Sequence, residues 1–194
     1  MVEQLRPDTA LIVIDVQAAF DHPRWGARNN PDADHNISGL VSAFGAADLP
    51  VVFVQHESSK PGSLFHPESP GHAFKDYLAT ATPDLVITKT VHSSFHGTPD
   101  LHTWLTAANV GSLVIAGITT NHCCETTARI AGDLGYDVVF ALDATHTFDR
   151  TSPDGSRVTA DELAGVTATN LHEEFATVVS TAQVLEGLGG IRAE

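Results

Sequence analysis

Cysteine is scarce in this sequence: its 194 residues contain two, and they are adjacent, Cys123 and Cys124. Two neighbouring cysteines provide no disulfide framework, no Cys-x-x-Cys redox motif and no zinc-ligand spacing. The sequence therefore predicts a reducing compartment. Successive residues that enter a helix point about 100° apart, so one thiol can be reactive while the other is packed. A buried structural role is the alternative for both, since free cysteine is among the most buried residue types.

Basic residues are also scarce, with 10 Lys and Arg against 24 Asp and Glu, which gives a formal net charge of -14. This balance disfavours nucleic acid and anionic membrane surfaces as partners, and it favours a cationic or neutral small-molecule substrate. No apolar run approaches the length of a membrane span, and residues 1–6 lack the apolar core of a signal peptide. We therefore expect a cytoplasmic protein.

Nucleotide-binding motifs are absent as well. Neither Gly-x-Gly-x-x-Gly nor Gly-x-x-x-x-Gly-Lys-Ser/Thr follows the first apolar run, which weakens the hypothesis of a nucleotide-binding module. The chain shows no internal repeat. Its length and its 42% hydrophobic content are sufficient for one sizeable core, so we expect a single domain over residues 1–194.

Short apolar runs alternate with helical stretches along the chain. These runs cover residues 10–15, 50–55, 85–89, 112–116, 137–142 and 175–180. They are nearly continuous in Val, Ile, Leu and Phe, which is typical of a parallel sheet that helices cover on both faces. The pattern predicts a three-layer α/β/α fold with a doubly wound parallel sheet, whose site lies beyond the carboxyl ends of the strands.

One helix start is legible in the sequence. Thr98, Pro99 and Asp100 provide an N-cap, a proline at the first helical position and an acidic first turn. The apolar residues that follow share one helical face. Gly111 stands where the helix should stop.

Polar residues of complementary chemistry terminate three of the apolar runs. Asp15 ends the first run, Lys89 ends the third, and the fourth leads through residues 117–124 into a good helix-forming stretch. A thiol at that turn would lie at a helix N-terminus, where free NH groups and the helix dipole favour thiolate and can hold an oxyanion. Turn or cap roles remain the alternative for Asp15, and a solvated strand end for Lys89.

Taken in order, these motifs resemble the isochorismatase-like cysteine hydrolases, which include nicotinamidases, N-carbamoylsarcosine amidase and streptothricin hydrolase. The resemblance covers nearly the whole chain and is carried by residues 10–17, 89–95, 117–123 and 143–148. It implies a six-stranded parallel sheet with strand order 3-2-1-4-5-6. It also implies an oligomer, because relatives commonly form one, and residues 65–74 could close the pocket of a neighbouring subunit.

The resemblance implies a catalytic triad of Asp15, Lys89 and Cys123. It favours Cys123 over Cys124, because relatives usually carry a small apolar side chain at the second position. It further implies a cis peptide between Ile118 and Thr119, with the backbone NH groups of Thr119 and Cys123 forming an oxyanion hole.

The expected reaction is hydrolysis of a C–N bond other than a peptide bond, in a carboxamide, lactam or ureido group. Cys123 would attack the carbonyl carbon and form a thioester. Asp15 would take the thiol proton, pass it to the leaving amine and later activate water. Lys89 would stabilise the thiolate and lower the pKa of the thiol. This chemistry needs no cofactor.

Further residues are predicted to line the substrate pocket because they flank the triad or follow strand ends: Gln17, Phe20, Trp25, His92, Phe95, His122 and Phe148. The eleven histidines invite a metal hypothesis. Metal-binding nicotinamidases carry an Asp-x-His motif after the second strand, where this chain reads Val-Gln-His-Glu at residues 54–57. We therefore expect no metal.

Two alternatives differ in function class. Hydrolysis of an isochorismate-like vinyl ether is one, although some relatives with that chemistry do not depend on the cysteine. A catalytically inactive scaffold or binding protein is the other, and the intact triad argues against it.

Overall fold

The computed structural model describes residues 4–191. Its main sheet contains six parallel strands in the order β3-β2-β1-β4-β5-β8. The strands are β1 (Thr9–Ile14), β2 (Val51–His56), β3 (Leu85–Lys89), β4 (Ser112–Ile118), β5 (Asp137–His146) and β8 (Thr177–Val179). Both the six strands and their order confirm the prediction. β5 extends four residues beyond its predicted end.

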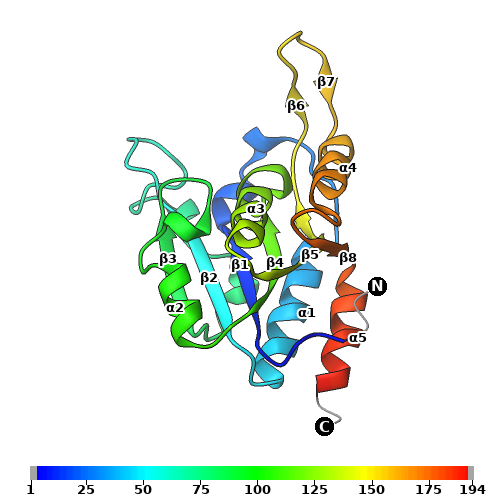
Figure 1. Cartoon of the computed structure of the whole chain (residues 1–194). Helices are drawn as coiled ribbons and strands as arrows, with labels where there is room; N and C mark the ends of the chain where they lie inside the picture. Colours follow the sequence, from blue (N-terminus) through cyan, green and yellow to red (C-terminus); the bar gives the residue numbers. More distant parts are fainter. Residues whose placement is uncertain (1–3, 192–194) are drawn as a thin grey trace.

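Helices cover both faces of this sheet (Figure 1). The helices are α1 (Ala33–Ala46), α2 (Leu101–Ala107), α3 (Glu125–Asp133), α4 (Ala160–Leu171) and α5 (Thr181–Ile191). α1 and α5 pack against one face, and α2, α3 and α4 pack against the other. The predicted three-layer α/β/α arrangement is confirmed.

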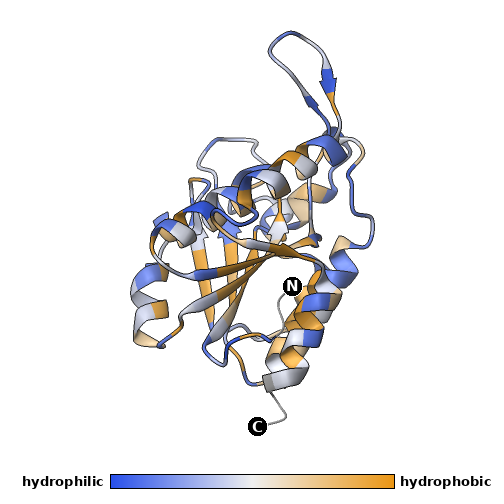
Figure 2. Cartoon of the chain, turned by 45° about the vertical axis from the view of Figure 1, so that its right-hand side comes forward, coloured by the Kyte–Doolittle hydropathy of each residue, from blue (hydrophilic) through white to orange (hydrophobic). Residues whose placement is uncertain are grey.

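The alternation of side chains along β1 shows why the strands are apolar throughout. Leu11 and Val13 point into the core beneath α1, whereas Ile12 and Ile14 point into the core beneath α3. All six residues of β1 are buried. Figure 2 shows the same distribution, with apolar residues concentrated in the sheet and on the helix sides that face it. None of the helices within residues 4–191 has the length and apolar content that a membrane crossing requires.

The start of α2 differs from the prediction. Its N-cap is Asp100, whose side chain accepts a hydrogen bond from the Thr103 NH at 2.7 Å. Thr98 is not the cap, because its backbone pairs with Thr88 of β3 through two hydrogen bonds of 2.8 and 2.9 Å. The helix ends before Ala108, so Gly111 lies beyond its C-terminus.

Residues 149–158 contain a short antiparallel arm. It consists of β6 (Arg150–Thr151) and β7 (Arg157–Val158). Figure 1 shows the arm projecting beyond the carboxyl end of the sheet, next to α4. The arm therefore stands at the edge where the predicted site lies.

Gly117 is required where β1 and β4 approach each other before the site. It lies opposite Ile14 in the register and has φ of 134°, a conformation that other residues rarely adopt. A Cβ atom at this position would overlap the backbone of Ile14.

We predict that Gly117→Ala lowers the free energy of unfolding by about 3 kcal/mol, because the methyl group forces the two strands apart. Gly39→Ala is the matched control: Gly39 lies within α1, and a methyl group added there would meet no neighbouring side chain or strand within 4 Å. That change should raise the free energy of unfolding by about 0.5–1 kcal/mol. Urea denaturation measures both, and equal effects would contradict the prediction.

Candidate active site

A buried ion pair joins two of the three predicted catalytic residues. Lys89 Nζ donates to Asp15 Oδ2 at 2.7 Å, and the Lys89 and Asp15 side chains are 0% and 1% exposed. Lys89 ends β3 and Asp15 follows β1, with β2 between them. The lysine side chain is long enough to reach past the end of β2, where His56 is its register partner. The two-strand separation therefore does not keep the charges apart.

Cys123 lies in a single π-helical turn, Thr120–Cys124, between β4 and α3. Its side chain is buried, and Sγ lies 3.8 Å from His92 Nδ1. The expected cis peptide between Ile118 and Thr119 is present. The strand-to-helix turn therefore carries the thiol at the carboxyl edge of the sheet, as predicted.

The ionisation of Cys123 differs from the prediction. Burial raises the pKa of the thiol and the charge of Asp15 raises it further, while Lys89 lowers it by a smaller amount. Lys89 therefore lowers the pKa of Cys123, as expected, but the pKa is raised overall because burial and Asp15 have the larger effect. Cys123 rests as a neutral thiol and needs a base to become a nucleophile.

Asp15 offers an oxygen for that purpose. Its Oδ2 is held by Lys89, whereas Oδ1 is buried and has no hydrogen-bond partner among the described residues. Burial alone would lower the pKa of Lys89, but the charge of the Asp15 carboxylate opposes burial and the pKa is raised overall, so the ammonium group persists. The arrangement combines a fixed cation, a carboxylate with one free oxygen and a neutral thiol.

A cavity of about 350 Å³ opens beside these groups. Asp15, Thr119 and Cys123 line it, whereas Lys89 is paired with Asp15 and does not line the cavity. Five of the predicted pocket residues also line the cavity: Phe20, Trp25, His92, His122 and Phe148. The rings of His92 and His122 stack at a centroid distance of 5.8 Å.

Gln17 and Phe95, also predicted as pocket residues, are placed elsewhere. Gln17 is buried, and its amide accepts from the His56 NH at 2.8 Å and donates to the carbonyls of His56 and His72. Phe95 packs in the core on the α2 side and contacts Tyr136. Gln17 therefore links the loop at His72 to the end of β2, and Phe95 is part of the hydrophobic core.

The prediction missed several residues that line the cavity: Arg24, His56, Phe65, Thr147, Asp149, Arg150 and Thr151. Phe65 begins the segment 65–74, which could close the pocket of a neighbouring subunit; it lines the cavity of its own chain, and the role in an oligomer stays a prediction. Residues 149–151 lie at the start of the arm. Only the tertiary arrangement of these two segments brings them to the site.

Four aromatic side chains form one wall of the cavity. Phe20 contacts Trp25, Phe65 and Phe148 at centroid distances of 5.3, 5.0 and 6.1 Å. Trp25 and Phe148 stack at 5.6 Å. We call this group the aromatic wall.

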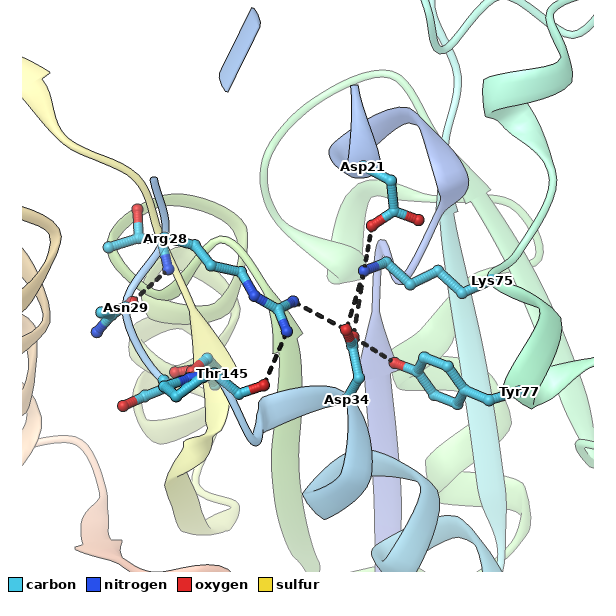
Figure 3. A network of polar contacts seen from close by, with 10 residues as sticks. Asp21, Arg28, Asn29, Asp34, Lys75, Tyr77 and Thr145 are labelled. Carbon is cyan, nitrogen blue, oxygen red and sulfur yellow. Dashed lines mark hydrogen bonds and ion pairs between the residues drawn. The ribbon is translucent and has the colours of Figure 1, made fainter. Parts of the chain in front are cut away.

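A network of charges centred on Asp34 anchors the segment that carries Phe20 and Trp25 (Figure 3). Asp34 pairs with Arg28 at 2.9 Å and accepts from Lys75 at 3.2 Å and from the Tyr77 hydroxyl at 3.0 Å. Lys75, whose side chain is 5% exposed, also pairs with Asp21 at 2.7 Å. Burial raises the pKa of Asp34, but the charges of Lys75 and Arg28 outweigh it and lower the pKa overall.

His146 is buried next to this network at the end of β5. Neither of its ring nitrogens has a hydrogen-bond partner among residues 4–191, and its ring meets Phe148 edge-on at 5.3 Å. Burial, together with the charges of Arg28 and Lys75, lowers the pKa of His146 to about 3. His146 is therefore neutral in the folded protein.

Within the part of the chain that the structure describes, no group of three His, Cys, Asp or Glu residues is placed to hold a metal ion. His92 and His122 lie together at the cavity, but they lack a third ligand of this kind.

A family model described as the Isochorismatase domain matches residues 9–183. The chain belongs to the isochorismatase family. A crystal structure of an isochorismatase-family protein from Chromobacterium violaceum matches it with a TM-score of 0.92 and 39% identity, covering 96% of this chain and 97% of the other.

Two curated relatives extend this comparison. The uncharacterised isochorismatase family protein YrdC from Bacillus subtilis is 40% identical over 91% of this chain and 94% of its own length. Streptothricin hydrolase from Streptomyces noursei is 36% identical over 75% of this chain and 57% of its own length. The isochorismatase family includes amidohydrolases, among them a ureidoacrylate amidohydrolase.

We predict that Asp34→Asn lowers the free energy of unfolding by about 2 kcal/mol, because it leaves the buried Lys75 ammonium with Asp21 as its remaining partner. Asp8→Asn is the control, since the Arg6–Asp8 pair is largely exposed and should contribute about 1 kcal/mol or less. Chemical denaturation compares the two variants. Equal losses would contradict a structural role for the network.

We also predict an acid-dependent loss of stability from His146. Its folded-state pKa of about 3 lies below the ordinary value of 6.5, so the unfolded chain takes up the proton first as the pH falls. The contribution is complete above pH 6.5 and declines by about 1.4 kcal/mol per pH unit below it. His146→Gln should reduce the slope of unfolding free energy against pH between about 6 and 4. An unchanged slope would rule out this role.

Proposed function

We propose that the chain is a cysteine amidohydrolase that cleaves a non-peptide C–N bond of a small molecule through a thioester on Cys123. The observation that carries the proposal concerns the Asp15 carboxylate next to the neutral Cys123 thiol: Lys89 holds its Oδ2, while its buried Oδ1 has no hydrogen-bond partner within residues 4–191. Membership of a family that includes amidohydrolases supports it.

In the first step, Asp15 Oδ1 accepts the Cys123 proton while the sulfur forms a bond to the carbonyl carbon. The carbonyl oxygen takes up negative charge, which the backbone NH groups of Thr119 and Cys123 would stabilise. Both residues line the cavity. The Lys89 ammonium offsets the charge that develops at the sulfur, because it lies next to both partners.

In the second step, the C–N bond breaks and the leaving nitrogen takes the proton from Asp15, which releases ammonia or an amine. Asp15, again a carboxylate, then removes a proton from water, and the hydroxide attacks the thioester. The C–S bond breaks, the sulfur recovers the proton, and the carboxylic acid leaves. The sum is amide plus water to acid plus amine, with no cofactor.

The retained thiol favours this chemistry over vinyl ether hydrolysis, which some relatives carry out without depending on the cysteine. The cytoplasmic location and the oligomer stay predictions.

A panel of small amides and ureas, assayed for release of ammonia or amine, tests the proposal. We expect Cys123→Ala to abolish turnover and Asp15→Asn to lower kcat by about 10²–10⁴, since the general base is lost. Intact mass spectrometry during turnover should detect an acyl adduct on Cys123.

Cys124→Ala is the matched control, because Cys124 is fully buried in the core and does not line the cavity. It should reduce stability and leave the acyl adduct in place. Full turnover by Cys123→Ala would defeat the proposed mechanism.

A further inference from the structure

The cavity carries unpaired positive charge in an acidic protein. Of the nine Lys and Arg residues within residues 4–191, six form ion pairs: Arg6, Arg28, Lys75, Lys89, Arg129 and Arg157. Arg24, Lys60 and Arg150 form none in the described part of the chain. Two of these three, Arg24 and Arg150, line the cavity. Two of the three basic side chains without an ion pair in the described residues therefore lie at the same cavity.

The acidic residues that line the cavity do not cancel this charge. Asp15 is paired with Lys89 at 2.7 Å. Asp149 is paired with Arg157 and also accepts from the Ala160 NH at 2.9 Å. Each carboxylate thus has a partner of its own, and the two arginines remain to bind an anion.

The positions of the arginines suit a ligand at the mouth of the cavity. The Arg24 guanidinium lies 4.9 Å from the centre of the Trp25 ring, a cation–π contact that holds it next to the aromatic wall. Arg150 begins the arm, and after the effect of burial its charge is the next largest cause that lowers the pKa of His122. Arg150 therefore acts electrostatically on His122, which also lines the cavity.

We propose that Arg24 and Arg150 bind a carboxylate of the substrate, whose flat, unsaturated body packs on the aromatic wall while its amide group faces Cys123. The inference rests on the proposed amidohydrolase function and specifies its substrate class as an anionic, unsaturated amide. Guanidinium groups favour carboxylates because their donors match the two oxygens. Stacked aromatic rings favour a planar partner.

This substrate class differs from the one that the whole-chain charge predicts. A net charge of -14 favours a cationic or neutral substrate when it is considered alone. The residues that line the cavity have the opposite balance, since both of its carboxylates are already paired. We give the local charges precedence because binding depends on the groups in contact with the ligand.

Isothermal titration calorimetry on the Cys123→Ala variant tests the inference without any turnover. Cinnamate, cinnamamide and cinnamylamine share one flat body and differ in the charge of one group. We expect cinnamate to bind about tenfold more tightly than cinnamamide and cinnamylamine to bind most weakly. Adding Arg24→Gln or Arg150→Gln should weaken cinnamate binding by about tenfold each.

Lys60→Gln in the same background is the control, because Lys60 is exposed and also forms no ion pair within residues 4–191, but does not line the cavity. It should leave the affinity for cinnamate unchanged. Equal affinities for the anion and the amide, no binding of any probe, or cinnamate binding that survives both arginine replacements would each overturn the inference. If cinnamate binding behaves as expected but no amide is hydrolysed, the amidohydrolase proposal fails and the carboxylate site stands.

Discussion

The buried pair of Asp15 and Lys89 sets the chemistry of the whole site. Burying either charge alone would cost several kcal/mol, so each requires the other. With the pair formed, the trio that includes Cys123 contains one cation, one anion and one neutral thiol, and its net charge is zero. A resting thiolate would add an uncompensated negative charge in a buried place, which explains why burial and Asp15 together raise the pKa of Cys123. In the proposed mechanism, the thiol therefore loses its proton only as the sulfur attacks the substrate.

The fold makes this pair possible by bringing distant strand ends to one edge. In the strand order β3-β2-β1-β4, β2 lies between the strands that end near Asp15 and Lys89. The turn that carries Cys123 follows β4, on the other side of β1. Asp15 turns out of its strand in the left-handed region with φ of 53°, which Asp tolerates better than most residues. Gly117, which has no Cβ atom, lets β4 lie close to the backbone of Ile14 at the end of β1. The geometry of the candidate site thus depends on backbone conformations at strand ends rather than on long side-chain networks.

These strand ends also mark the limit of what the sequence could predict. Apolar runs predicted all six strands, and the family resemblance, supported by polar residues at strand ends, implied the three positions of the proposed triad. Gln17 and Phe95 were misplaced because the direction of a side chain just beyond a strand depends on how the backbone turns there. Phe65 and Arg150 were missed because they come from irregular segments, whose position at the cavity is a property of the tertiary structure.

Net charge and local charge also act on a substrate at different distances. Surface carboxylates are screened by salt beyond about 8–10 Å, so the acidity of the chain influences the approach of a ligand more than its bound state. Arg24 and Arg150, which form no ion pair within residues 4–191, line the cavity itself. In the proposed complex, the net charge would slow the approach of an anionic ligand modestly, and the two arginines would contact the bound ligand. The composition of the chain bears on how a charged ligand approaches. How the ligand is bound depends instead on which charged side chains at the cavity already have a partner.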